Sequence, residues 1–325
     1  MATAVTLAVQ TILDELTQRH RERGNEARAA TMTIVVFFED ATIGALARER
    51  IHALAAKHPS RVIILDATAA ETVQRVEERD WIELGVKSAG AEVMRSAVAA
   101  LRLPEAPVVL LWIAPGIGDD DRFCELSPEA QTIVYNSSLV HEGGESLDEL
   151  AAYSQRHPEL ELADIAYLRL APWQESVAIF FDGRVDELAE VRRVEIACGS
   201  DPEGFYLLGW LASRLRWRPD DGDTLIDEAG HRIEFAISRD GEPRRIRRVA
   251  LTAKHATFVA EVDRRGETIS LSVSGHGEQP RYRAVNNPGI AALVERAILW
   301  GHNDRVFRDA LAAAGEILAR RSSLT

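Results

Sequence analysis

The chain has 325 residues, of which 46% are hydrophobic and 27% charged, and its formal net charge is −13. This composition is typical of a folded protein of about two domains and excludes a largely disordered chain. A strongly negative charge repels polyanions, so we expect neither a nucleic acid nor an anionic membrane as a partner.

The two cysteines, Cys124 and Cys198, are too few for a disulfide framework or a four-cysteine zinc site. They fit a reducing compartment, and their redox role stays open. The opening residues MATAVTLAVQTILDEL lack the cationic segment of a signal peptide. The apolar stretch 106–118 contains two prolines and is too short to span a bilayer. We therefore expect a cytoplasmic protein.

The first half of the chain alternates between helices and apolar strands. Apolar residues at helical spacing predict a first helix from Val5 to Leu16. Continuous β-branched and aromatic runs predict buried strands at residues 31–38, 61–66, 107–113 and 132–135. Helices are expected between and after them at 43–57, 91–101 and from about 146. Strands separated by helices predict an α/β domain with a doubly wound parallel sheet.

A helix beginning at Pro172-Trp173 closes this half, and Asp182-Gly183 ends it. We place the domain boundary there, which gives an α/β domain at 1–184 and an α+β domain at 185–325.

The second half has a different periodicity. A strand is expected at 191–197 and a helix from Asp201-Pro202. Alternating apolar and polar residues at 233–237 and 269–273 predict strands with one buried face. Glycine-containing turns at 239–241 and 264–266 predict hairpin loops, and helices are expected from Asn287-Pro288 and Asn303. These patterns predict an antiparallel sheet covered by helices on one face.

The sequence contains no motif typical of a cofactor or catalytic site. Residues 39–44 (EDATIG) follow the first strand with one glycine, where a dinucleotide fingerprint needs three, and their two carboxylates would repel a pyrophosphate. The aspartates 119–121 could contact a divalent cation, but successive side chains point in different directions, which favours a solvated loop. No HExxH or GxSxG pattern occurs. We expect no catalytic residue, cofactor or metal.

Eight arginines lie on the strands and turns of the second half, at positions 244, 245, 247, 248, 264, 265, 281 and 283. They could form a face for an acidic partner or a phosphorylated ligand. They could equally be a solvated sheet face paired with Glu234, Glu261 and Glu267.

An ordered set of segments resembles the OpcA family of glucose-6-phosphate dehydrogenase assembly proteins. The segments are 28–31 (RAAT), 58–63 (HPSRVI), 103–104 (LP), 107–112 (PVVLLW), 164–175 (DIAYLRLAPWQE), 180–182 (FFD) and 207–215 (LLGWLASRL). The resemblance implies a Rossmann-like N-terminal domain and a distinct C-terminal domain. It also implies a non-catalytic protein that binds glucose-6-phosphate dehydrogenase, promotes its active oligomer and activates the oxidative pentose phosphate pathway.

Such a partner surface should contain aromatic and arginine anchors. The candidates are Arg61, Arg169, Trp173, Arg245 and Arg247. For Trp173, as for Trp112, packing in the core is the competing interpretation. A second hypothesis is a sensor that binds a sugar-phosphate effector or a nucleotide through the arginine-rich face.

Overall fold

The computed structural model describes residues 9–15, 18, 30–70, 73–76, 80–140, 145–240, 245–275, 277, 279–285, 288–300 and 304–322. Residues 9–15 are helical, and the rest of the first predicted helix lies mainly outside the described residues. Arg244 and the predicted helix starts at Asn287 and Asn303 also lie outside them. No helix among the described residues is long and apolar enough to cross a membrane.

The first sheet has seven strands in the order β3-β4-β2-β1-β5-β6-β7. The strands are β1 (Met32–Phe38), β2 (Ser60–Asp66), β3 (Val73–Val76), β4 (Trp81–Gly85), β5 (Val108–Ile113), β6 (Thr132–Tyr135) and β7 (Glu161–Asp164). The pairs from β4 through β2, β1 and β5 to β6 are parallel, and β3 is antiparallel to β4. The parallel sheet is confirmed, whereas β3, β4 and β7 were not predicted.

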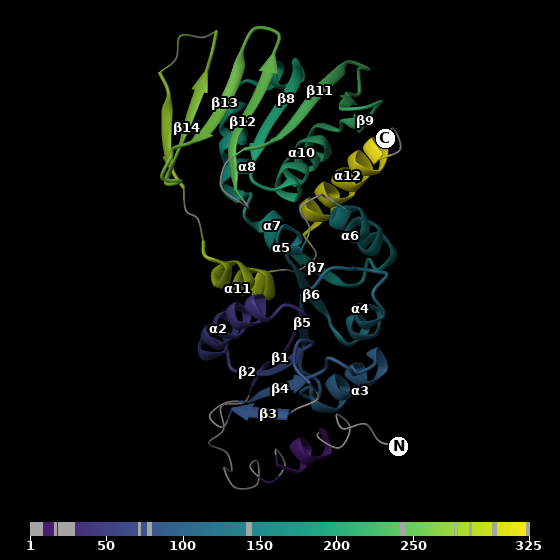
Figure 1. Cartoon of the computed structure of the whole chain (residues 1–325). Coiled ribbons are helices and arrows are strands. Elements are labelled where there is room, and N and C mark those ends of the chain that lie inside the picture. Colours follow the sequence, from purple (N-terminus) through teal and green to yellow (C-terminus); the bar gives the residue numbers. More distant parts are fainter. Residues whose placement is uncertain are drawn as a thin grey trace. The chain divides into compact units, whose positions relative to one another are not determined.

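Helices pack against this sheet (Figure 1). They are α2 (Ala41–Lys57), α3 (Ala91–Leu101), α4 (Asp121–Leu126) and α11 (Ile290–Trp300). The Asp40 carboxylate accepts a hydrogen bond from the Ile43 backbone N–H at 2.8 Å and so caps α2. Far along the chain, α11 contacts α2, and Glu295 on α11 pairs with Lys57 at 3.2 Å and with His58 at 2.8 Å.

The second sheet has eight strands in the order β15-β14-β13-β12-β8-β11-β10-β9. They are β8 (Val191–Cys198), β9 (Arg218–Pro219), β10 (Thr224–Ile226), β11 (Arg232–Arg239), β12 (Ile246–Ala253), β13 (Thr257–Val262), β14 (Thr268–Val273) and β15 (Arg281–Ala284). The accompanying helices are α5 (Ser137–Val140), α6 (Glu145–Arg156), α7 (Ile165–Leu168), α8 (Ala171–Phe180), α9 (Val185–Ala189), α10 (Asp201–Leu215) and α12 (Arg305–Ser322).

The position of β8 corrects one prediction. β8 lies between β11 and β12, parallel to the first and antiparallel to the second. The turn at 239–241 therefore does not close a hairpin, and the hairpin predicted there is wrong. Turn residues indicate only local chain reversal. They do not indicate that β8, from earlier in the chain, pairs between β11 and β12. The hairpin predicted at 264–266 is confirmed, because β13 and β14 pair antiparallel around it.

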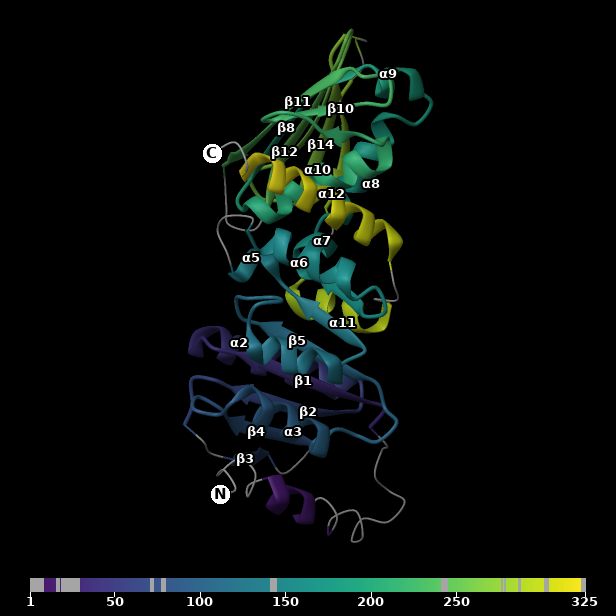
Figure 2. The same cartoon turned by 90° about the vertical axis from the view of Figure 1, so that its right-hand side faces the viewer.

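The second sheet is mixed but mostly antiparallel, and helices pack on one of its faces (Figure 2). α10 contacts β8 and β11, while α8 contacts β13 and β14. The ring of Phe258 on β13 packs against Phe180 and Phe181, with ring centroids 5.6 and 4.7 Å away. α10 and α12 cross closely at Gly209, where a Cβ would lie 2.4 Å from the Ala310 carbonyl oxygen.

The chain forms two compact units whose ranges interleave. The first unit contains residues 1–136, 157–163 and 290–303, and the second contains 137–156, 164–289 and 304–325. The predicted domains, 1–184 and 185–325, are consecutive stretches of the chain, and the boundary between them stays a prediction.

Candidate functional site: the edge of the first sheet and a groove in the second unit

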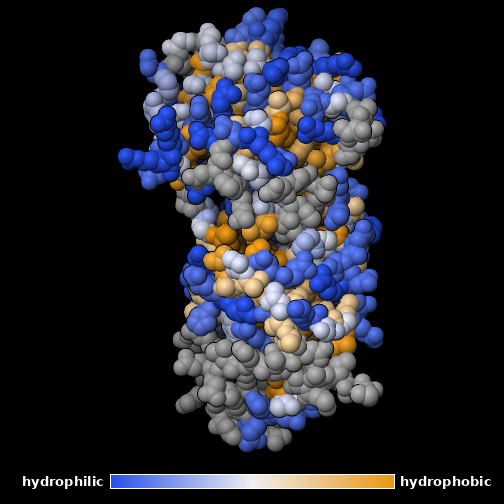
Figure 3. Space-filling view, viewed as in Figure 1, coloured by the Kyte–Doolittle hydropathy of each residue, from blue (hydrophilic) through white to orange (hydrophobic). Residues whose placement is uncertain are grey.

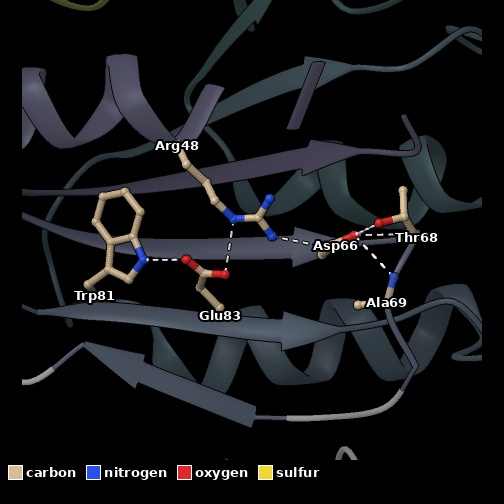
Figure 4. Close-up of polar contacts among 6 residues, drawn as sticks. All are labelled: Arg48, Asp66, Thr68, Ala69, Trp81 and Glu83. Atoms are coloured by element: carbon tan, nitrogen blue, oxygen red, sulfur yellow. Dashed lines mark hydrogen bonds and ion pairs between the residues drawn. The ribbon is translucent and has the colours of Figure 1, made fainter. Parts of the chain in front are cut away.

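Parallel sheets bind nucleotides beyond the carboxyl ends of their strands, so this edge of the first sheet is the first candidate site. At the end of β2, the Asp66 carboxylate accepts hydrogen bonds from the Arg48 guanidinium at 2.5 Å and the Thr68 hydroxyl at 2.6 Å (Figure 4). The backbone N–H of Thr68 and that of Ala69 donate to it as well, at 2.8 and 3.2 Å. Arg48 also donates to Glu83 on β4 at 3.1 Å.

These contacts determine the charge of Asp66. Burial alone would raise its pKa, but the hydrogen bonds from Thr68 and Arg48 outweigh burial and lower the pKa below the ordinary value. Asp66 is therefore ionised at neutral pH, and its oxygens are engaged by groups of the protein itself.

The end of β1 is closed in the same way. Arg122 on α4 pairs with Glu39 at 3.0 Å and with Asp120, and its guanidinium lies 5.0 Å from the centre of the Phe37 ring. Asp120 caps α4, accepting from the Arg122 backbone N–H at 2.8 Å, so this aspartate of the 119–121 triplet has a structural role.

The Phe38 side chain fills the space between β1 and α2. A Cβ on Gly44 would lie 2.3 Å from Cε2 of the Phe38 ring, so the single glycine of the 39–44 segment gives room to a protein side chain. A pyrophosphate normally binds at the N-terminus of the helix that follows β1. Here the Asp40 carboxylate already caps that helix, and Glu39 adds a second negative charge. The residues at this edge do not fit a dinucleotide.

Three of the predicted partner-binding residues are largely enclosed by the protein. Arg61 donates to the Leu101 carbonyl at 2.9 Å, and its side chain is 14% exposed. Arg169 pairs with Glu203 at 3.1 Å, and Trp173 is buried, as Trp112 is. Core packing therefore accounts for both tryptophans, and a partner role for Arg61, Arg169 and Trp173 stays a prediction.

The arginines of the second half that the structure describes do not all lie on one face of the sheet. Arg248 on β12 lies opposite Glu261 in the β-ladder, whereas Arg283 on β15 bonds to Glu175 of α8, on the helix-covered side. Arg247 lies at a bulge, half-exposed, and Arg245 is exposed. Of the glutamates predicted as partners, Glu234 pairs with Arg193 at 3.0 Å instead.

In the view of Figure 3 most of the coloured residues are hydrophilic, and one of the groups of hydrophobic residues lies near α11. Ile290 and Leu299 on that helix are 38% and 37% exposed.

The second unit contains an apolar groove of about 490 Å³ between α8, α9 and α10. It is lined by Val177, Ala178, Ile179, Phe181, Asp182, Leu188, Trp210, Leu211 and Leu215. Ile179 is 40% exposed, Trp210 is half-buried, and Asp182 is the one charged side chain in this lining. We call this surface the α8–α10 groove.

Comparison with known proteins assigns the chain to a family. Residues 51–152 match the family model for the N-terminal domain of the glucose-6-phosphate dehydrogenase subunit, and residues 160–311 match the model for the C-terminal domain of the same protein, both under the OpcA name. The chain belongs to the OpcA family.

Among the OpcA relatives, a protein of Synechocystis named as a candidate OxPP cycle protein OpcA is 28% identical over 191 residues, covering 51% of this chain and 39% of its own length. The OpcA of Nostoc punctiforme is 31% identical over 170 residues, covering 50% of this chain and 35% of its own length. This chain thus matches little more than a third of either relative.

Solved structures show a shared fold. An oxidoreductase from Sinorhizobium meliloti matches with a TM-score of 0.55 at 11% identity, covering 91% of this chain and 98% of that one. KijD10, a 3-ketoreductase from Actinomadura kijaniata, matches with a TM-score of 0.56 at 11% identity, covering 90% and 97%. At this identity the likeness shows the fold alone.

In this OpcA-family chain, sequence reasoning missed a buried polar network in the second unit. Asp164 accepts hydrogen bonds from the Ala166 N–H at 2.8 Å, the Tyr206 hydroxyl at 2.9 Å and the Ser137 N–H at 3.2 Å. Complete burial raises the pKa of Asp164 despite these donors. Burial likewise raises the pKa of Glu203, although Arg169 and Ser200 donate to it. The sequence offered a weak signal, because Asp164 and Arg169 both lie in a segment that resembles the family.

Proposed function

We propose that this chain is a non-catalytic effector that binds glucose-6-phosphate dehydrogenase, promotes its active oligomer and so activates the oxidative pentose phosphate pathway. The observation that carries the proposal is the succession of two family models, both named for a subunit of that dehydrogenase, over residues 51–152 and 160–311.

The geometry of the first sheet supports a role without redox chemistry. Glu39 and Asp40 follow β1, where a pyrophosphate would bind; Glu39 is paired with Arg122, and Asp40 caps α2. An effector of this kind acts by binding one conformational or oligomeric state of its target more tightly than another. A tenfold preference corresponds to about 1.4 kcal/mol.

The test is size-exclusion chromatography with light scattering on the chain, on the dehydrogenase of the same organism, and on their mixture. Fractions are assayed for NADP reduction with glucose 6-phosphate. We expect co-elution, a larger dehydrogenase oligomer and raised activity, and no NADP reduction by the chain alone. Separate elution at micromolar concentrations with unchanged activity would refute the proposal.

A further inference from the structure

We propose that the α8–α10 groove is the docking site for the dehydrogenase, and that it receives an apolar side chain flanked by lysine or arginine on the partner surface. This inference rests on the proposed function and adds to it the surface and the kind of segment recognised.

The lining determines the chemical class of the occupant. Eight of the nine residues that line the groove are apolar, and the ninth, Asp182, is negatively charged. A sugar phosphate or nucleotide needs cationic or N–H donors, so a carboxylate at this position disfavours both. An apolar side chain of a protein fits, because it removes Ile179 and Trp210 from water. Tryptophan is also among the residues that most often dominate the binding energy of an interface.

The groove offers one charge for complementarity. Asp182 is exposed in its lining and has no basic partner among the residues that the structure describes. The nearby Arg184 is paired with Glu187 at 3.9 Å. This carboxylate therefore favours a partner whose apolar anchor has a basic neighbour, since opposite charges at an interface speed association and fix its orientation.

Two segments far apart in the sequence build the walls. Ile179 and Phe181 come from the end of α8 and the residues after it, and Trp210 and Leu215 come from α10. Phe181 and Asp182 lie in the 180–182 segment that resembles the OpcA family, and Trp210 and Leu215 lie in the 207–215 segment. The matched C-terminal family model, over 160–311, covers the whole groove.

The test measures the dissociation constant between the full chain and the dehydrogenase by biolayer interferometry. Ile179→Lys places a positive charge against the basic partner segment, and Trp210→Ala removes part of the wall. We expect each variant to weaken binding at least tenfold. Leu46→Lys is the matched control, because Leu46 is 54% exposed on α2 of the first unit. It should bind as tightly as the unchanged chain.

A charge variant tests the role of Asp182. Asp182→Asn should slow association and make it less sensitive to salt. Glu49→Gln on α2 removes one charge elsewhere and should leave the salt dependence nearly unchanged. Thermal unfolding of every variant identifies any that fails to fold. Because Ile179 is already exposed, Ile179→Lys keeps the test valid if Trp210→Ala unfolds.

The outcomes separate the two proposals. If the unchanged chain binds and the groove variants bind equally well, the groove is not the docking site and the proposed function stands. If the unchanged chain does not bind the dehydrogenase at all, the proposed function fails and this inference with it. If Ile179→Lys instead converts a dimer of the chain into a monomer and leaves dehydrogenase binding intact, the groove holds a second copy and the proposal is overturned.

Discussion

The edge of the first sheet and the α8–α10 groove are lined by side chains of different kinds. At the edge, Arg48 and Arg122 neutralise the carboxylates beside them, and Phe38 fills the remaining space. The groove keeps apolar side chains partly exposed, beside the single carboxylate of Asp182. In this fold, which the chain shares with oxidoreductases, the edge of the parallel sheet is closed by the chain's own side chains, and the proposed binding surface lies in the second unit.

Two buried aspartates extend this comparison, because Asp66 has a cationic partner and Asp164 has only hydrogen-bond donors. Asp164→Ala would leave two backbone N–H groups and the Tyr206 hydroxyl without their acceptor, and we expect it to lower the free energy of unfolding by about 3 kcal/mol or more. Asp164→Asn keeps an oxygen for the N–H donors and should cost about 1 kcal/mol at most near neutral pH. Urea unfolding followed by circular dichroism measures both.

The asparagine variant also has a pH signature. Because burial raises the pKa of Asp164 in the folded chain, the folded state holds the proton more tightly. That stabilisation is fully present below the unfolded pKa and is lost as pH rises through the folded value. The free energy of unfolding of Asp164→Asn should therefore rise relative to that of the unchanged chain as pH rises from about 4. Parallel unfolding curves at every pH would contradict the raised pKa.

For Asp66, at the edge of the first sheet, we expect a smaller pH dependence of the free energy of unfolding, with the opposite sign. The pKa of Asp66 is lowered, so its contribution is present above the unfolded pKa and is lost as pH falls through the folded value. Asp66→Asn should lower the free energy of unfolding by roughly 1 kcal/mol at pH 7, and this loss should shrink as pH falls below about 4. Urea unfolding across this range tests it, with Glu49→Gln as an exposed control. A cost that stays constant with pH would mean that shape, and not charge, makes Asp66 important.

For small-molecule ligands we expect no change in the melting temperature of the chain. A ligand at about 100 times its dissociation constant adds about 2.7 kcal/mol of stability. Because the edge is closed by its own side chains, millimolar NADP should leave the melting temperature of the chain unchanged, and the dehydrogenase serves as the positive control. Glucose 6-phosphate should behave likewise. A shift of several degrees with NADP would show that the edge opens, and would favour the sensor hypothesis.

The strands and helices with strong periodicity could be predicted from the sequence, because local apolar spacing determines them. β1, α3 and α10 lie within a residue or two of their predicted positions. β3 and β4 were missed because neither strand contains a long apolar run. The place of β8 between β11 and β12 was missed because strand order depends on contacts between residues distant in sequence.

Of the two candidate surfaces, one could be predicted from the sequence and the other could not. The lack of a dinucleotide fingerprint at 39–44 is a local pattern, so the sequence indicated the character of that edge. The groove could not be predicted, because Ile179, Leu188 and Trp210 each look like ordinary residues of an amphipathic helix. They form a hollow only when α8, α9 and α10 pack together.

The contact of α11 with α2 has a consequence for how the protein is made. During translation β1, α2 and β2 leave the ribosome early, whereas Glu295 is synthesised 238 residues after its partner Lys57. The first unit therefore cannot be completed until nearly the whole chain has been synthesised. Until then, the side of α2 that contacts α11 is uncovered. A fragment that ends near residue 184 would lack α11. The surface of α2 that α11 covers in the full chain would then be a site for chaperone binding or aggregation.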